Sequence, residues 1–308
     1  MRLVDSHCHL QVRPFDADLA EVIAAARAAG VERILVPGVD VATSEAALAV
    51  VDAHPWLDAA AGIHPHVAAE AGAEAWARIV ELAVDPRVIA LGETGLDYDR
   101  AWSPPADQRA NLRRHLDLAL ATGKPAILHC RSKPGERDAQ DDLLAAMREA
   151  GFGDATATAR FAGRPPAVLH SVSGPADYVA AALALGCAVS VSGLAFRKGE
   201  EATAEAVRLV PRDALLVETD APYLSPPGAP RRRNAPEWVA ITARWVAERL
   251  AEEPDALGEA LVASYDRLFV RPDRPQADAD RSAVPRGHDA DDSGRDGALD
   301  IPTTGRVD

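Results

Sequence analysis

Eight short apolar runs recur along the chain, and amphipathic stretches with helical spacing separate them. The runs lie at residues 3–7, 33–38, 57–64, 88–94, 125–130, 166–171, 188–193 and 215–220. Helical patterns are expected near residues 19–26, 43–53, 72–84, 106–122, 138–150, 175–185, 201–209, 235–251 and 256–269. Strands of a parallel sheet are covered on both faces and therefore read as unbroken apolar runs. The alternation predicts an α/β fold with eight parallel strands.

Two parallel architectures can hold such a pattern. An open doubly wound sheet usually carries a glycine-rich phosphate loop after its first strand, and the sequence has none there. Eight strand–helix repeats within about 250 residues instead favour a single TIM (β/α)8 barrel. In such a barrel the active site lies at the carboxyl ends of the strands, which we call the mouth.

The barrel is expected to span residues 1–270. Residues 132–165 form the longest connection, for which we expect a helix and an inserted loop that could overhang the mouth. Residues 271–308 are rich in Pro, Gly, Asp and Arg and poor in apolar side chains. Such a segment cannot bury enough apolar surface to offset its ordering entropy, so a disordered acidic tail is predicted there.

Composition excludes several classes of protein. The net charge of −14 provides no overall attraction to nucleic acid or to anionic membranes, so a polyanion must be bound locally. No run approaches the roughly 20 apolar residues of a spanning helix, and the N-terminus lacks the features of a signal peptide. Three sparse cysteines, Cys8, Cys130 and Cys187, are expected to be free thiols. We expect a cytoplasmic protein without a membrane or an obligate protein partner.

Potential metal ligands occur at six of the eight predicted strand ends. They are His7 and His9, His64 and His66, Glu93 and Asp97, His129, His170, and Glu218 and Asp220. Residues two apart in a strand point to the same side, so both histidines of the first pair can face the mouth while Cys8 faces away. So many ionisable groups in an apolar mouth are costly unless a cation neutralises them.

This mixture of imidazoles and carboxylates suits Zn²⁺, Mn²⁺ or Co²⁺, and also Mg²⁺ where oxygen ligands dominate. Four histidines, Glu93 and Asp220 are more ligands than one four-coordinate ion needs. Two ions about 3.5–4 Å apart, bridged by a carboxylate, would use them all and would activate a water for hydrolysis. The sequence therefore predicts a hydrolase with one or two divalent ions.

The motifs DSHCHL, GIHPH, GETGLDYD, LHCR, LHSVSG, FRK, VETDAPYLSP and RRRNAP follow one another over residues 5–236. Together they resemble the TatD family of metal-dependent deoxyribonucleases, within the amidohydrolase superfamily, over residues 1–270. The resemblance implies a TIM barrel that cleaves phosphodiester bonds, often as an exonuclease, by means of a metal-activated water. Its expected substrates are DNA ends or single-stranded DNA.

The resemblance also implies a role for each matching residue. His7 and His9 would hold one ion together with Asp220, and His129 and His170 would hold the other, with Glu93 bridging the two. Asp220 would also orient or deprotonate the attacking water, so Asp220 and Glu93 are the expected catalytic residues.

Expected substrate contacts are His64, Arg131 and Arg197, and the first two have an ordinary alternative. His64 could bond the scissile phosphate or fix its own loop. Arg131 could grip a phosphate with paired donors or pair with a nearby carboxylate. Arg197 belongs to one of two basic clusters expected at the mouth, residues 197–198 and 231–233. Tyr98 and Tyr223 could stack on a base or pack inside the protein.

The same scaffold hosts other chemistry, so two alternatives stay open. One is an amidohydrolase-type enzyme that acts on a small ester, lactone or amide. The other is a barrel that binds metal without catalysis, which the intact ligand set disfavours. One departure from the family pattern is HSVSG in place of the usual HCFSG, which keeps His170 but replaces two neighbouring side chains.

Overall fold

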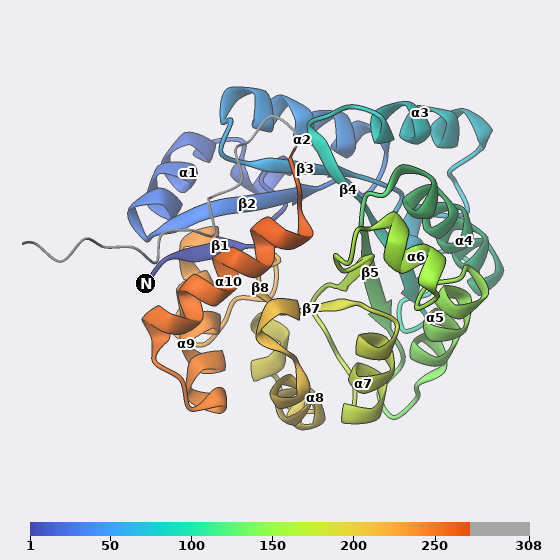
Figure 1. The fold of residues 1–308 in the computed structure, drawn as a ribbon. Helices are drawn as coiled ribbons and strands as arrows, with labels where there is room; N and C mark the ends of the chain where they lie inside the picture. Colours follow the sequence, from blue (N-terminus) through green and yellow to red (C-terminus); the bar gives the residue numbers. More distant parts are fainter. Residues whose placement is uncertain (272–308) are drawn as a thin grey trace, which may run out of the picture. The chain divides into compact units, whose positions relative to one another are not determined.

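The computed structural model describes residues 1–271, so the predicted tail lies, apart from Arg271, outside the described residues. Eight strands follow one another around a central ring in sequence order, and each neighbouring pair is parallel (Figure 1). The strands are Leu3–Asp5 (β1), Val31–Pro37 (β2), Asp58–Ala61 (β3), Val88–Asp97 (β4), Ala126–Arg131 (β5), Ala167–Leu169 (β6), Ala188–Val191 (β7) and Leu215–Val217 (β8).

The ring closes between its first and last strands. Ser6 donates its N–H to the carbonyl oxygen of Val217 at 3.1 Å, and Cys8 forms an isolated parallel bridge with Ala221. Closure leaves each strand with one face toward the barrel interior and the other toward the helices, so that all ten residues of β4 are buried. The predicted eight-stranded barrel is confirmed.

Helices surround the strands (Figure 1). They are Leu19–Ala28 (α1), Val41–Ala53 (α2), Ala73–Ala83 (α3), Pro105–Thr122 (α4), Asp138–Glu149 (α5), Ala155–Arg160 (α6), Ala176–Ala184 (α7), Glu201–Ala206 (α8), Val239–Leu250 (α9) and Pro254–Leu268 (α10). Local chemistry sets their ends. Asp40 and Thr43 form a reciprocal capping box at the start of α2, and Gly123 ends α4 in the left-handed conformation at φ +71°.

The long connection between β5 and β6 contains α5 and the short helix α6. Arg160 of α6 donates from Nε to the carbonyl oxygen of Leu120 at 2.8 Å, near the end of α4. The end of α4 leads into the start of β5, so this contact lies at the amino ends of the strands, opposite the mouth. The expectation that this segment overhangs the mouth is therefore wrong, because the extra residues follow α5 instead of preceding it.

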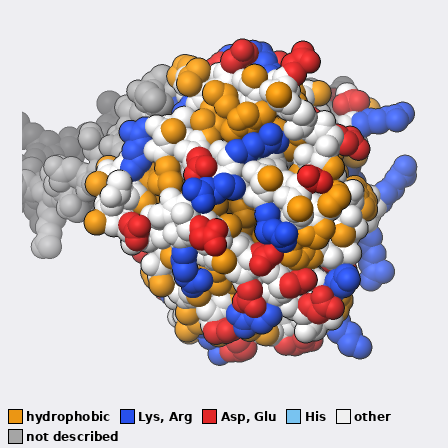
Figure 2. Space-filling view, turned by 90° about the vertical axis from the view of Figure 1, so that its right-hand side faces the viewer, with side chains coloured by type: hydrophobic (Ala, Val, Ile, Leu, Met, Phe, Trp, Pro, Cys, Tyr) orange, Lys and Arg blue, Asp and Glu red, His pale blue; other side chains and the backbone are white. Residues whose placement is uncertain are grey.

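Figure 2 shows the side of the barrel on which α3, α4 and α5 lie, where acidic, basic and apolar side chains are interspersed. Residues 1–271 contain no helix that is both long and apolar enough to span a lipid bilayer. The three cysteines are free, as predicted, and Cys8 and Cys187 are buried in the core.

Two glycines allow β3, β4 and β5 to approach closely where their polar residues begin. A Cβ added at Gly62 would lie 2.5 Å from the Cα of Gly92. A Cβ added at Gly95 would lie 1.9 Å from the carbonyl oxygen of His129, and Gly95 has φ +137°. Any larger residue at these positions would force the strand ends apart.

The substitution Gly95→Ala is therefore expected to destabilise the barrel and displace His129. Overpacking of this kind costs about 1–3 kcal/mol, and the disfavoured φ adds to that cost. Since 1 kcal/mol lowers the melting temperature of a domain of this size by roughly 2–4 °C, calorimetry should show a drop of about 5 °C or more. Gly72→Ala is the matched control, because a Cβ there would meet no atom within 4 Å. Equal melting temperatures for the two variants would contradict the close approach.

Candidate metal centre at the barrel mouth

Seven polar side chains converge at the mouth, and we call them the Glu93 cluster. They are His7, His9, His64, Glu93, His129, His170 and Asp220. Several predicted strands ran two or three residues too far, since β1 ends at Asp5 and β8 at Val217. The cluster residues that follow these strands leave the ladder, and their side chains turn toward the mouth.

One oxygen of Glu93 faces the residues that follow β1 and β8. Glu93 Oε2 lies 3.2 Å from His7 Nε2 and 3.6 Å from His9 Nε2. The two imidazole nitrogens are 3.1 Å apart, and Asp220 Oδ1 lies 3.4 Å from His9 Nε2. An ion bound tetrahedrally at about 2.0–2.1 Å from each donor separates its ligand atoms by about 3.4 Å. The donor atoms of His7, His9 and Glu93 therefore come close to the spacing that such an ion requires, and Asp220 Oδ1 lies beside the same two histidines.

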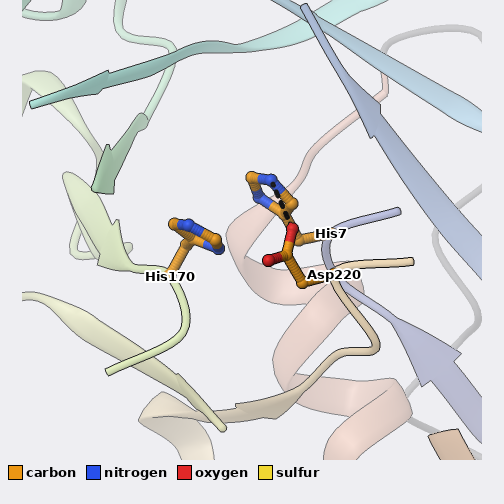
Figure 3. Close-up of side chains that lie close together, drawn as sticks. All are labelled: His7, His170 and Asp220. Carbon is orange, nitrogen blue, oxygen red and sulfur yellow. Dashed lines mark ion pairs between the residues drawn. The ribbon is translucent and has the colours of Figure 1, made fainter. Parts of the chain in front are cut away.

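The other oxygen of Glu93 faces the residues of β5 and β6. Glu93 Oε1 lies 3.0 Å from His129 Nδ1 and 3.1 Å from His170 Nε2. Glu93 therefore touches two separate groups of donors, one with each oxygen. The two groups adjoin, because the rings of His7 and His170 stack with centroids 3.8 Å apart. Figure 3 shows these two rings beside the carboxylate of Asp220.

His64 also reaches the cluster, with Nε2 3.1 Å from Glu93 Oε1. Its other ring nitrogen, Nδ1, accepts the backbone N–H of His66 at 3.1 Å. Because burial lowers the pKa of His64 to about 4, the ring is neutral at pH 7, and an accepting Nδ1 places the single proton on Nε2. His64 thus presents an N–H donor to the cluster, and this protonated nitrogen has no lone pair for a metal.

Buried carboxylates orient the histidines of the second group. Glu218 Oε1 lies 2.9 Å from His170 Nδ1, and Asp97 Oδ2 lies 3.3 Å from His129 Nε2 and 2.7 Å from His66 Nε2. Each carboxylate accepts a hydrogen bond from one ring nitrogen and leaves the other nitrogen directed at Glu93, an arrangement typical of metal-binding histidines. Asp97 was expected as a potential metal ligand and not in this role. The sequence does contain a pattern that indicates this contact. Glu93 and Asp97 lie four residues apart in one strand, so their side chains lie on the same face.

Asp97→Asn is expected to weaken metal binding about 10- to 100-fold, the usual cost of losing such a carboxylate partner. The amide can no longer fix which nitrogen of His129 carries the proton. Isothermal titration of the metal-free protein with Mn²⁺ or Zn²⁺ measures the change. Asp117→Asn, which alters an exposed Arg113–Asp117 pair on α4, should leave the affinity unchanged. An Asp97→Asn protein with parental affinity would show that Asp97 does not orient His129.

The charges of the cluster also fit a cation. Among residues 1–271, no lysine or arginine side chain forms an ion pair with Glu93, Asp97, Glu218 or Asp220. Burial acts to raise the pKa of Glu93, but the surrounding imidazoles outweigh it and hold that pKa well below its usual range. Glu93 is therefore an anion whose only neighbouring compensation comes from histidines. Its donor set, imidazole nitrogens with carboxylate oxygens, suits divalent transition metals.

The predicted substrate residues differ in whether they are exposed or already paired with a carboxylate. Arg131 pairs with Asp99 at 2.8 Å, which is the ordinary alternative considered for it, and Arg197 is exposed after β7. Arg233, in the second basic cluster, is held by Asp18. Tyr98 is buried and donates its hydroxyl to Asp142 at 2.7 Å, so it packs inside the protein.

Comparisons with known proteins show the family to which the chain is similar. Residues 4–270 match the family model described as TatD related DNase. A 3′-5′ ssDNA/RNA exonuclease from Erwinia billingiae is 34% identical, and the match covers 88% of this chain and 100% of the relative. An uncharacterized metal-dependent hydrolase from Bacillus subtilis is also 34% identical, with 87% and 98% covered. The crystal structure of a TatD homologue from Escherichia coli has a TM-score of 0.76 at 26% identity, covering 87% and 98%.

A parallel eight-stranded barrel that gathers imidazoles around a buried glutamate at its mouth defines a metal-dependent hydrolase with the amidohydrolase fold. The family match covers nearly the whole described chain. The protein belongs to the TatD-related DNase family, and the resemblance noted in its motifs is confirmed.

Proposed function

We propose that this protein is an exonuclease that removes nucleotides from the 3′ end of single-stranded DNA or RNA with the help of two divalent ions. The observation that carries the proposal is that each oxygen of Glu93 faces its own group of donors. A bridging carboxylate between two ions is typical of enzymes that cleave phosphodiesters. The substrate and the polarity follow from the Erwinia billingiae relative.

The two donor groups assign the ligands. His7, His9, Asp220 and Glu93 Oε2 would hold one ion, and His129, His170 and Glu93 Oε1 would hold the other. Imidazole-rich sites favour Mn²⁺ or Zn²⁺ over Mg²⁺, which prefers oxygen ligands and keeps several waters. When bound, the ions supply an acidified water and draw charge from a phosphoryl oxygen.

The remaining chemistry falls to side chains at the edge of the cluster. The Asp220 side chain is 14% exposed and that of Glu93 is 4%, so Asp220 is the carboxylate that an incoming water meets first. It is placed to orient that water and to accept its proton at Oδ. The Nε2–H of His64 can turn from Glu93 to a phosphoryl oxygen, where it would bind developing negative charge.

Phosphate contacts outside the cluster would come from a few exposed cations. Arg197 and Lys198 follow β7, and Arg231 and Arg232 are also exposed. Arg131 could join them by exchanging Asp99 for a phosphate. On a chain with net charge −14, such contacts are few, so affinity for long duplexes should be weak and sensitive to salt.

The test is digestion of single-stranded DNA and RNA oligonucleotides, labelled at the 5′ or the 3′ end, in the presence of Mg²⁺, Mn²⁺ or Zn²⁺. A 3′ exonuclease shortens the 5′-labelled strand stepwise and releases the 3′ label at once as a mononucleotide. Chelation with EDTA should stop the reaction, and a matched duplex should be digested more slowly.

Bound ions without digestion of any oligonucleotide would overturn the proposal. Small esters, lactones and amides would then be the substrates to assay on the same metal-loaded protein. Release of the 5′ label first would reverse the polarity while keeping the nuclease.

A further inference from the structure

Two aromatic rings are left exposed at the mouth, one on each side of the Glu93 cluster. Trp102 is 67% exposed and Tyr223 is 55% exposed. Among residues 1–271 the other exposed large hydrophobic side chains, Val80, Val84 and Leu209, are all aliphatic. Burying an indole ring is strongly favourable, so an exposed one beside a functional site needs an explanation.

The two rings adjoin different donor groups. Trp102 lies in the loop between β4 and α4, and its ring contacts His66, the partner of Asp97, with centroids 4.3 Å apart. Tyr223 follows β8, three residues after Asp220, and its ring lies edge-on to His9 at 5.9 Å. Strands β4 and β8 are four positions apart in an eight-stranded ring, so they stand on opposite sides of the mouth.

Buried side chains fix the loop that carries Trp102. Ser103 is 1% exposed, and its hydroxyl donates to the carbonyl oxygen of His66 at 2.9 Å and accepts the N–H of Ala69 at 3.1 Å. On the other side of the tryptophan, Ala101 donates its N–H to the carbonyl oxygen of Asp97 at 3.2 Å. The backbone on both sides of Trp102 is therefore anchored, and the exposure of its ring is not the result of a loose loop.

The loop that carries Tyr223 is fixed in the same way. Asn234 is fully buried, and its Nδ2 donates to the carbonyl oxygens of Thr219 at 2.9 Å and Tyr223 at 2.8 Å. The N–H of Tyr223 bonds the carbonyl oxygen of Asp220 at 2.8 Å. Both rings thus have a rigid base and more than half of their surface exposed, which suits a preorganised binding platform.

We propose that Trp102 and Tyr223 are stacking platforms for unpaired nucleobases, one on each side of the phosphodiester that is cleaved. This inference rests on the proposed nuclease function and adds how the site selects its substrate. Every base has a π-face, so such platforms bind single strands without sequence preference. The guanidinium of Arg100 lies 5.7 Å from the Trp102 ring centroid, where it adds positive charge for the adjoining phosphate. A base-paired nucleotide cannot offer its faces to either ring, so the platforms would exclude duplex interiors.

The test compares an oligothymidylate with the same sugar-phosphate chain in abasic form. The two have equal charge and differ only in the bases, so the ratio of their KM values isolates stacking. For the parent protein we expect a KM about 10-fold or more higher on the abasic chain. In Trp102→Ala and in Tyr223→Ala, the KM for oligothymidylate should rise and the ratio of the two KM values should fall. Trp102→Phe and Tyr223→Phe keep an aromatic ring, so they should keep most of the parental KM ratio.

A second measurement needs no turnover. In EDTA, oligothymidylate should quench the tryptophan fluorescence of the parent protein and should quench that of Trp102→Phe much less. The abasic chain should quench the fluorescence of neither protein. Val84→Ala, which alters an exposed side chain at the end of α3, is the control and should leave the KM ratio unchanged. Equal KM values for both chains on the active parent would overturn the platforms while the nuclease proposal stands. Cleavage of neither chain would instead count against the proposed function itself.

Discussion

Glu93→Gln is expected to reduce the turnover of single-stranded oligonucleotides by at least about 10³-fold and to lower the content of bound metal. Glu93 contacts both donor groups with its two carboxylate oxygens, Oε2 at 3.2 Å from His7 and Oε1 at 3.0 Å from His129. Glutamine has nearly the same shape, but it carries no charge and turns an NH₂ group toward one of the two groups. A loss of this size equals about 4 kcal/mol of transition-state stabilisation.

The measurement pairs steady-state kinetics with elemental analysis of protein dialysed against limiting metal. Glu149→Gln, which neutralises an exposed glutamate at the end of α5, is the matched control and should keep both rate and metal. Circular dichroism should show that Glu93→Gln is folded, because His129 and His170 keep Asp97 and Glu218 as carboxylate partners. Parental turnover with two bound ions would show that Glu93 does not bridge them.

The barrel itself could be predicted from the sequence because its physical cause is local. A strand covered on both faces must be apolar throughout, and this leaves unbroken runs such as Val88 to Leu91. The strand ends were predicted less well. His7 and Asp220 follow apolar runs but stand beyond β1 and β8, where the two neighbouring chains leave the strands and lie side by side at the mouth. Periodicity describes a strand and cannot show where the chain leaves it.

The identities of the cluster residues could also be predicted, but the chemical state of each could not. That His64 presents an N–H depends on a backbone turn in which its Nδ1 accepts from His66. That Arg131 pairs with Asp99 depends on a contact between the end of β5 and the loop that follows β4. The exposure of Trp102 depends on Ser103, which is buried beneath the loop. The last two facts depend on tertiary contacts, for which residue types and spacing carry no signal, and the first depends on the exact geometry of a local turn.

Asp220→Asn is expected to lower kcat about 10²-fold or more while the KM for single-stranded oligonucleotides changes little. Asp220 has φ +53°, a left-handed conformation that asparagine tolerates better than other replacements, so the local backbone should persist. Its N–H would still bond the carbonyl oxygen of His7 at 2.9 Å. The amide cannot accept a proton from water, and general-base catalysis typically contributes 10²–10⁴-fold.

The contrast with Glu93→Gln separates the roles of the two carboxylates. The ion pairs of Asp220 are with His7 and His9, at 3.8 Å and 3.4 Å, so its variant should keep the ion held by His129 and His170 and lose rate more than metal. Elemental analysis and kinetics under the same conditions as for Glu93→Gln make the comparison direct, with Asp117→Asn as the surface control. If Asp220→Asn lost metal in proportion to rate, and excess Mn²⁺ restored its turnover, Asp220 would act only as a ligand. A low kcat that persists at saturating metal is the result expected of the residue that takes the proton from water.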